Sequence, residues 1–422
     1  MPASSRQMNG AIQTPEMQLS MQPAPSGRPF TRNGGYSRGS MYIPPWPGLT
    51  FKDILGRATT ERLPYPFSAP RQQAFCVARS GIYHLFRALR FQPGETVLMP
   101  DYFSGNEVAA VRAAGATVVF YPIQRNLEPD WSKLSELAAH SSTRVIYVIH
   151  YLGWSQPLDR FRELCRDTGA IMVEDCALSL LSQDNGKPLG SAGDYSVFCV
   201  YKTLPVPSGG LLVQNNDALP PLTDLNLEPC PPMTAIGRTA ELAFEALRSN
   251  WNRTGEMLFQ LKHTMGAKLR AAEIRSVPVG DIGWNIANVN VGVSPLYHRI
   301  VQSTDCTEVV VRRRRNYLNL QERLRGRIRL LRDDLPEGVC PLFFPILVAK
   351  KHKTALDLRA RGIQAVEFWN DPVKDDIGPA ARYLRAHVLE LPIHQGVSAA
   401  QIEFIAREIE RLNPEPAPPF PS

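Results

Sequence analysis

An acidic residue and a lysine stand at the ends of two consecutive apolar runs. The run 170–173 ends in Glu174 and Asp175, and the run 195–201 leads directly to Lys202. Strand ends in an open α/β sheet face the ligand crevice, where a lysine among apolar neighbours can form a Schiff base and a carboxylate can hold a protonated pyridine nitrogen. This pair suggests a pyridoxal phosphate (PLP) site. Taken alone, Asp175 could instead cap a turn, and Lys202 could be a solvated loop residue.

The start of a predicted helix offers a second set of candidate residues. Arg79 and Ser80 follow the apolar run 74–77. Apolar residues then repeat at i, i+3, i+4 and i+7: Ile82, Leu85, Phe86 and Leu89. A helix N-terminus presents free N–H groups and partial positive charge, so a phosphate could bind there with Arg79 and Ser80. A plain serine cap beside a solvated arginine is the alternative.

Three further candidates follow predicted strands. Tyr102 and Phe103 come after the strand 96–99, and His150 comes after the strand 144–149. Aromatic faces suit a flat, electron-poor ring, so Tyr102 or Phe103 could stack on a cofactor. They could equally close the core, and His150 could be a structural histidine as well as a ligand contact.

Strand and helix patterns alternate through the first half of the chain. Helices are predicted at 105–114, from Asp130 onward and at 158–168, between strands at 96–99, 117–120, 144–149 and 170–175. This alternation predicts an α/β fold with a mostly parallel sheet, right-handed crossovers and helices on both faces. A smaller α+β lobe is predicted from a helix at 309–324, a strand at 342–348, a helix at 354–361, a strand at 363–367 and a last helix with a Ser398–Gln401 capping box.

The length of 422 residues exceeds the roughly 250–300 residues at which one core stops growing. We therefore expect two lobes and tails. The predicted division is a disordered tail over 1–42, a large PLP-binding α/β domain with an N-terminal arm over 43–245, connecting helices and a small α+β domain over 246–413, and a disordered tail over 414–422.

Charge and cysteine content narrow the class of protein. The net charge of +7 is spread along the chain, and its densest run, 312–315, falls in a helical pattern that predicts a mostly solvated helix. We therefore expect neither nucleic acid nor membrane as a partner. The seven cysteines lack metal-ligand spacing, which predicts reduced thiols and no metal site. Without a membrane span or signal-peptide pattern, the expected location is the cytoplasm.

Several motifs in order resemble the DegT-type (DegT/DnrJ/StrS) sugar aminotransferase family, which consists of PLP enzymes of the aspartate aminotransferase fold. The resemblance covers about residues 70 to 413. The segments that carry it are 78–81, 90–100, 114–117, 173–177, 189–194, 201–202, 208–210 and 391–394.

The family resemblance implies a role for each candidate residue. Lys202 would hold PLP as a Schiff base, and Asp175 would pair with the pyridinium nitrogen. The cofactor phosphate would be bound by Arg79 and Ser80, with Tyr102 or Phe103 near the ring. The resemblance also implies a homodimer in which the segment 282–293 crosses toward the active site of the partner subunit. The asparagines of this segment could equally only cap turns. The implied reaction moves an amino group from glutamate to a keto group of a nucleotide-linked sugar, in surface-polysaccharide or secondary-metabolite synthesis.

The chain also departs from the family pattern. Leu178 stands where many members carry glutamine or histidine, Cys199 replaces a serine commonly used on the phosphate, and the interval from Asp194 to Lys202 is short. A non-catalytic scaffold or regulator of the same fold is therefore an alternative. A nicotinamide-binding oxidoreductase is disfavoured, because no G-x-G-x-x-G follows the first strand.

Overall fold

A seven-stranded sheet dominates the first half of the chain. The computed structural model describes residues 41–57, 63–140, 142–222, 225–250, 279, 283–370 and 373–420. The strands are β1 (Gln72–Phe75), β2 (Glu95–Pro100), β3 (Thr117–Tyr121), β4 (Ser142–Ile149), β5 (Ile171–Asp175), β8 (Tyr195–Cys199) and β9 (Gly210–Gln214). Their order is β1-β9-β8-β5-β4-β2-β3. Only β9 is antiparallel to its neighbours, so the other six strands run in one direction.

The central strands are buried on both faces, which explains their continuous apolar sequences. All residues of β5 and β8 are buried. The register pairs Ile149 of β4 with Asp175 of β5, and Asp175 with Val197 of β8. Parallel strands covered on both sides read as unbroken apolar runs, as the sequence predicted. The predicted mostly parallel α/β sheet is therefore confirmed.

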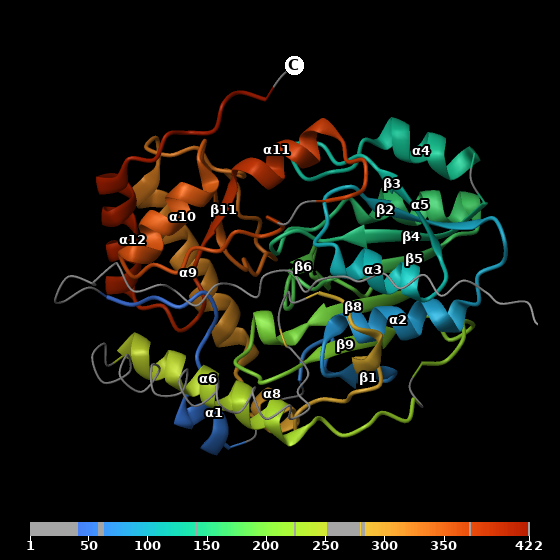
Figure 1. Cartoon of the computed structure of the whole chain (residues 1–422), viewed down its shortest axis with the longest axis horizontal. Helices are drawn as coiled ribbons and strands as arrows, with labels where there is room; N and C mark the ends of the chain where they lie inside the picture. The colour runs from blue at the N-terminus through green and yellow to red at the C-terminus, as the bar shows by residue number, and fades with distance from the viewer. Residues whose placement is uncertain are drawn as a thin grey trace, which may run out of the picture. The chain divides into compact units, whose positions relative to one another are not determined.

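Four helices connect the parallel strands. These are α2 (Ala78–Leu89), α3 (Asn106–Ala113), α4 (Trp131–His140) and α5 (Leu158–Thr168). α2 packs against α3, and α4 packs against α5. Right-handed connections place the two pairs on opposite faces, and Figure 1 shows α2 and α3 in front of the strands. α5 ends where predicted, because Gly169 adopts a left-handed φ of 71°.

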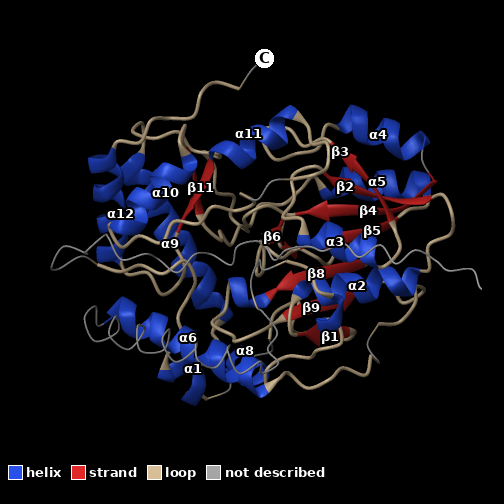
Figure 2. Ribbon diagram, viewed as in Figure 1, coloured by secondary structure: helices blue, strands red, loops and turns tan. Residues whose placement is uncertain are grey.

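A second set of elements follows in the C-terminal half (Figure 2). It comprises α9 (Cys306–Leu324), β10 (Phe344–Leu347), α10 (Lys351–Ala360), α11 (Pro379–His387), β11 (Val388–Leu391) and α12 (Ala399–Leu412). β10 and β11 form an antiparallel pair, and the predicted Ser398–Gln401 capping box starts α12. The remaining elements are α1 (Phe51–Leu55), β6 (Gln183–Asp184), β7 (Lys187–Pro188), η1 (Val200–Lys202), α6 (Pro232–Asn250), η2 (Ile286–Asn288) and α8 (Leu296–Ser303). None of the described helices has the length and apolar character needed to cross a bilayer.

The predicted strand at 363–367 does not form as a continuous strand. Ile363 bridges to Ile43, and Val366 bridges to Glu390 on another side. Between them the Ala365 N–H bonds to the Ile363 carbonyl at 2.8 Å, which is a tight turn. The bend prevents one ladder from running through the segment.

The prediction of a disordered tail over 414–422 does not hold for residues 414–420. The Ala349 N–H bonds to the Glu415 carbonyl at 2.8 Å, and the Ala417 N–H bonds to the Leu347 carbonyl at 3.2 Å. These bonds lay the tail along β10, and prolines are tolerated there because an edge segment needs few donors. Residues 1–40 and 421–422 lie outside the described residues, and the predicted domain division stays a prediction.

The arginine run on α9 is also less solvated than predicted. Arg312 and Arg315 are exposed, but Arg313 is 1% exposed. Arg313 shares a helix face with the buried Val309 and Tyr317, four residues away on either side. The helical period therefore turns one of the four arginines into the interior.

Candidate functional site

The candidate residues follow the carboxyl ends of parallel strands, as predicted. Asp175 is the last residue of β5, and Lys202 ends the short helix η1 that follows β8. Tyr102 and Phe103 come just after β2, and α2 begins three residues after β1. Because these strands run in one direction, all of these segments lie at the same edge of the sheet (Figure 1).

Asp175 is a buried carboxylate, 6% exposed, that two neighbours orient. Its Oδ2 accepts a hydrogen bond from the Tyr147 hydroxyl at 2.7 Å, and its Oδ1 accepts one from the Ala177 N–H at 2.8 Å. Burial raises the pKa of Asp175, although the Tyr147 and Ala177 hydrogen bonds and the charge of Lys202 oppose the shift. A buried carboxylate that is oriented by two hydrogen bonds is suited to pair with a cation.

Tyr147 was missed by the sequence analysis. Register places Tyr147 opposite Val173, and Ile149 opposite Asp175. Side chains alternate along a strand, so Tyr147 and Asp175 project from the same face. The alternation was present in the sequence, but the pairing register needed the structure.

Lys202 is likewise buried, with 8% of its surface exposed. Its Nζ lies 5.4 Å from the ring centroid of Phe368, which belongs to the segment between α10 and α11. It also interacts electrostatically with Asp175. The chain thus brings an amine and a carboxylate, far apart in sequence, into one buried environment.

The loop after Lys202 packs directly on the start of α2. The Gly209 N–H bonds to the Cys76 carbonyl at 3.0 Å. A Cβ on Gly210 would lie 2.3 Å from the backbone nitrogen of Ala78. Ser80 is buried, its hydroxyl donates to the Asn288 carbonyl at 3.4 Å, and Arg79 is half-buried. The lysine segment and the predicted phosphate-binding helix start are therefore adjacent.

This close contact gives a prediction for Gly210→Ala. The new methyl has no room against the backbone of α2, so we expect a loss of about 1–3 kcal/mol in the free energy of unfolding. Thermal or urea unfolding of the purified protein measures the loss. Gly237→Ala is the matched control, because nothing lies within 4 Å of a Cβ built there. Equal stability of the two variants would contradict the close packing.

Tyr102 and Phe103 have different surroundings. The Phe103 ring stacks on Phe120, with centroids 4.9 Å apart and planes within 9°, as part of the core. The Tyr102 ring meets Trp369 edge-on at 4.3 Å, and Trp369 neighbours Phe368 at 6.1 Å. Of the two, Tyr102 is the one connected to the lysine through an aromatic group.

Two buried residues of ionisable type, Lys351 and Glu390, form hydrogen bonds with the backbone of Phe368. Lys351 Nζ donates to the Phe368 carbonyl at 2.8 Å, and the Phe368 N–H donates to Glu390 at 3.2 Å. Burial raises the pKa of Glu390, an effect that the charge of Lys351 opposes. Trp369 adopts a left-handed φ of 54°, which is costly for a bulky residue. This turn over the lysine is therefore fixed rather than loose.

His150 has a structural role. Its Nδ1 accepts the Gln156 N–H at 3.1 Å, and its Nε2 lies 2.9 Å from Glu174. Glu174 also accepts N–H groups from Gly190, Ala192 and Gly193. Burial would raise the pKa of Glu174, but these hydrogen bonds and His150 lower it overall. His150, Glu174 and Cys176 lie close enough together to hold a metal ion, but the ring nitrogens of His150 and the carboxylate oxygens of Glu174 already take part in these hydrogen bonds.

The residues that depart from the family pattern are also placed. Cys199 ends β8 opposite Gly210 and is buried, and Leu178 is part of the hydrophobic core. In the segment 282–293, the Asn285 side chain accepts the Ala287 N–H and so caps a turn. Asn288 contacts Ser80 of its own chain through its carbonyl.

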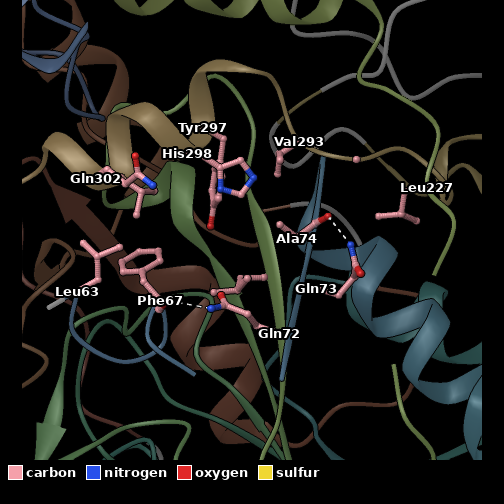
Figure 3. Close-up of a pocket in the computed structure, with 13 residues that line it drawn as sticks. Leu63, Phe67, Gln72, Gln73, Ala74, Leu227, Val293, Tyr297, His298 and Gln302 are labelled. Carbon is pink, nitrogen blue, oxygen red and sulfur yellow. Dashed lines mark hydrogen bonds between the residues drawn. The ribbon is translucent and has the colours of Figure 1, made fainter. Parts of the chain in front are cut away.

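A separate cavity of about 530 Å³ lies between β1 and α8. Figure 3 shows Tyr297 and His298 above it, and Gln72 donating to the Phe67 carbonyl below. The polar groups that line it are neutral amides, a histidine and a tyrosine whose hydroxyl has no partner among the described residues. Its described lining residues include no amine and no carboxylate, unlike the site around Asp175 and Lys202.

Comparison with solved structures defines the class of fold. Spr1654 of Streptococcus pneumoniae, a proposed sugar aminotransferase solved in its PMP form, aligns with a TM-score of 0.62 at 17% identity, over 88% of this chain and 98% of that one. PseC of Helicobacter pylori, an aminotransferase of pseudoaminic acid biosynthesis, aligns with a TM-score of 0.61 at 17% identity over the same shares. The chain has the fold of these aminotransferases, as predicted.

Residues 73–223 match the model of the DegT/DnrJ/EryC1/StrS aminotransferase family. GDP-perosamine synthase of Vibrio cholerae is 28% identical over 135 residues, which is 31% of this chain and 36% of that protein. UDP-N-acetyl-3-dehydro-alpha-D-glucosamine 3-aminotransferase of Acidithiobacillus ferrooxidans is 30% identical over 134 residues, again 31% and 36%. The chain thus matches about a third of the length of these curated relatives. The predicted family resemblance is confirmed over residues 73–223, while the roles of single residues stay predictions.

Proposed function

We propose that the protein is a PLP-dependent aminotransferase. The observation that carries the proposal is the buried pair of Asp175 and Lys202 at the carboxyl edge of the sheet, inside the segment that matches the family. The residues fit the cofactor, because the amine of Lys202 and the carboxylate of Asp175 lie near the start of α2. This helix start carries the half-buried Arg79 and the buried Ser80. Such a donor set matches an aldehyde, a pyridine nitrogen and a phosphate.

Each residue has a distinct task in this proposal. Lys202 holds the cofactor through its amine and, once released, moves a proton at the α-carbon of the amino donor. Asp175, oriented by Tyr147 and the Ala177 N–H, keeps the ring nitrogen protonated. When bound, PLP supplies the electron sink for the carbanion.

The phosphate would bind at the start of α2. The first turn of this helix contains no acidic residue to repel an anion. The Ser80 hydroxyl and the Arg79 guanidinium would add to the free N–H groups and the positive end of the helix. We retain Cys199 and Tyr102 as cofactor contacts, and Phe103 only through its backbone, because its ring is in the core.

The substrates we propose are glutamate as donor and a keto group of a nucleotide-linked sugar as acceptor. The names of the two relatives, a GDP-perosamine synthase and an aminotransferase of a UDP-linked dehydrosugar, support this class. Synthesis of surface polysaccharide or of a secondary metabolite would use such a product. A non-catalytic scaffold of the same fold is the alternative, for which Leu178 and Cys199 are the motivating departures.

We further propose a cytoplasmic homodimer with the large and small domains divided near residue 245. All seven cysteines are free thiols, which suits a reducing compartment. Exposed apolar side chains on α1 and α6, Phe51, Leu55 and Ile236, are compatible with a subunit contact. Light scattering of the purified protein measures its mass, and a monomer at micromolar concentration would refute the dimer.

The decisive experiment is the visible spectrum of the purified protein with PLP, before and after glutamate is added. We expect a yellow band that is lost with glutamate as the amino group moves to the cofactor, and restored by a keto acceptor. A colourless protein that takes up no PLP would refute the aminotransferase and favour the scaffold. A band that glutamate leaves unchanged would refute glutamate as the donor.

A further inference from the structure

We propose that Arg313, together with Gln395, is a positioning residue for Lys202. Arg313 is buried on α9, and its guanidinium NH2 donates to the Thr203 carbonyl at 3.2 Å. Gln395 Nε2 donates to the same carbonyl at 2.9 Å. This is the first carbonyl after Lys202, so two side chains from the C-terminal half hold the lysine-bearing turn. The inference rests on the function proposed above.

The guanidinium of Arg313 is fixed by its other donors. Its Nε donates to Gln395 Oε1 at 2.9 Å, and its NH1 donates to the carbonyls of Leu342 at 3.0 Å and Pro341 at 3.3 Å. The planar fork of arginine therefore joins three separate segments at one point. A displacement of α9 or of the Gln395 loop would reach the Lys202 turn directly.

The turn that bears Lys202 is also held by the Leu204 N–H, which bonds to the Val200 carbonyl at 2.9 Å. The Thr203 N–H bonds back to the Val200 carbonyl at 3.0 Å and closes the 3-10 turn, while the Thr203 carbonyl points to Arg313 and Gln395. The two donors thus fix the Thr203–Leu204 peptide, which lies one peptide beyond the lysine. Proton transfer depends on alignment of the amine, and a misplacement of about 1 Å can cost about 100-fold in rate.

The charge of Arg313 is not neutralised by any carboxylate in the described part of the chain. Burial lowers the pKa of Arg313 to about 10, which leaves it charged at neutral pH. Its titratable neighbours are neutral there: burial lowers the pKa of His394 to about 3 and raises the pKa of Cys340 to about 11. Burying a cation without a carboxylate partner is costly, and the hydrogen bonds of Arg313 to four carbonyl oxygens offset that cost.

This charge gives the second part of the proposal. A fixed positive charge beside the Lys202 turn disfavours protonation of nitrogen atoms held there, whereas the carboxylate of Asp175 on β5 favours it. Arg313 therefore both orients Lys202 and lowers the pH at which its adduct with PLP gains a proton. These two effects can be separated by substitution.

The test compares four variants of the full chain loaded with PLP. Arg313→Leu removes both the guanidinium hydrogen bonds and the positive charge, whereas Arg313→Lys keeps the charge. Gln395→Glu removes one hydrogen-bond donor to the Thr203 carbonyl and places a negative charge next to Arg313. Arg315→Leu removes an exposed charge from the same helix and is the matched control. Two quantities are measured: the pH midpoint of the visible band without substrate, and the rate at which glutamate removes the band in a single turnover.

We expect Arg313→Leu to raise the midpoint by about one pH unit and to slow the single turnover about 10- to 100-fold. Arg313→Lys should keep the midpoint but remain slow, and Gln395→Glu should change both quantities as Arg313→Leu does. If Arg313→Leu does not fold, the midpoint and the single-turnover rate of Gln395→Glu test the proposal. Values for both variants equal to those of Arg315→Leu would overturn the inference while leaving the aminotransferase intact. A wild-type protein without a band would overturn the proposed function first.

Discussion

We expect Lys202→Ala to remove the visible band and to slow amino transfer strongly. The amine of Lys202 is the group that we propose holds the cofactor and moves the proton. Loss of the acid–base group alone costs about 10²- to 10⁴-fold in rate. We therefore expect turnover of glutamate to fall by about 10⁴-fold, with the absorption of any bound PLP shifted to that of the free aldehyde.

Mass spectrometry after borohydride treatment gives an independent readout of the same prediction. Wild-type protein should carry the reduced PLP adduct on the peptide that contains Lys202. Lys187→Ala is the matched control, because Lys187 is an exposed lysine on β7 and should leave both the adduct and the turnover unchanged. An adduct on another lysine in the wild-type protein would show that Lys202 is not the attachment residue.

The sequence predicted the sheet and the location of the site because both depend on local patterns. The unbroken apolar runs of β5 and β8 follow from burial on both faces. The end of α5 at Gly169 follows from a left-handed glycine. Asp175 and Lys202 could be located because a charged residue at the end of a buried apolar run lies at the edge of the sheet.

Residues that act through long-range contacts could not be predicted in the same way. Arg313 lies in a run of four arginines, and only its contact with Thr203, 110 positions away, shows why it is buried. Lys351 and Glu390 meet at the backbone of Phe368 because β11 and α10 pack together, which no local pattern encodes. The tail at 414–420 is ordered by the exposed edge of β10, and its own composition indicated disorder.

Asp175→Asn should lower turnover about 10²- to 10³-fold while PLP remains attached to Lys202. The proposed task of Asp175 is to stabilise positive charge on the ring nitrogen, and loss of one preorganised electrostatic group typically costs this much. The neutral amide keeps the shape of the carboxylate and can still accept the Ala177 N–H. The visible band should therefore persist, and the single-turnover rate with glutamate measures the loss.

The same substitution has an opposite effect on the cofactor-free protein. Burial raises the pKa of Asp175 in the folded state above its ordinary value of about 3.9. A raised carboxyl pKa contributes stability that is fully present below the unfolded pKa and is lost as the pH rises through the folded pKa. Asparagine does not titrate, so the stability of Asp175→Asn relative to wild type should increase from pH 4 to pH 8.

Thermal unfolding of the two cofactor-free proteins across this pH range measures the trend. Asp167→Asn is the matched control, since Asp167 is exposed on α5. A flat difference for Asp175→Asn would mean that its carboxyl is not destabilised by burial. If Asp175→Asn instead loses activity and gains relative stability as the pH rises, the buried carboxylate is unfavourable for the fold and is kept because the cofactor requires it. Such a cost in stability is expected where a site is selected for chemistry.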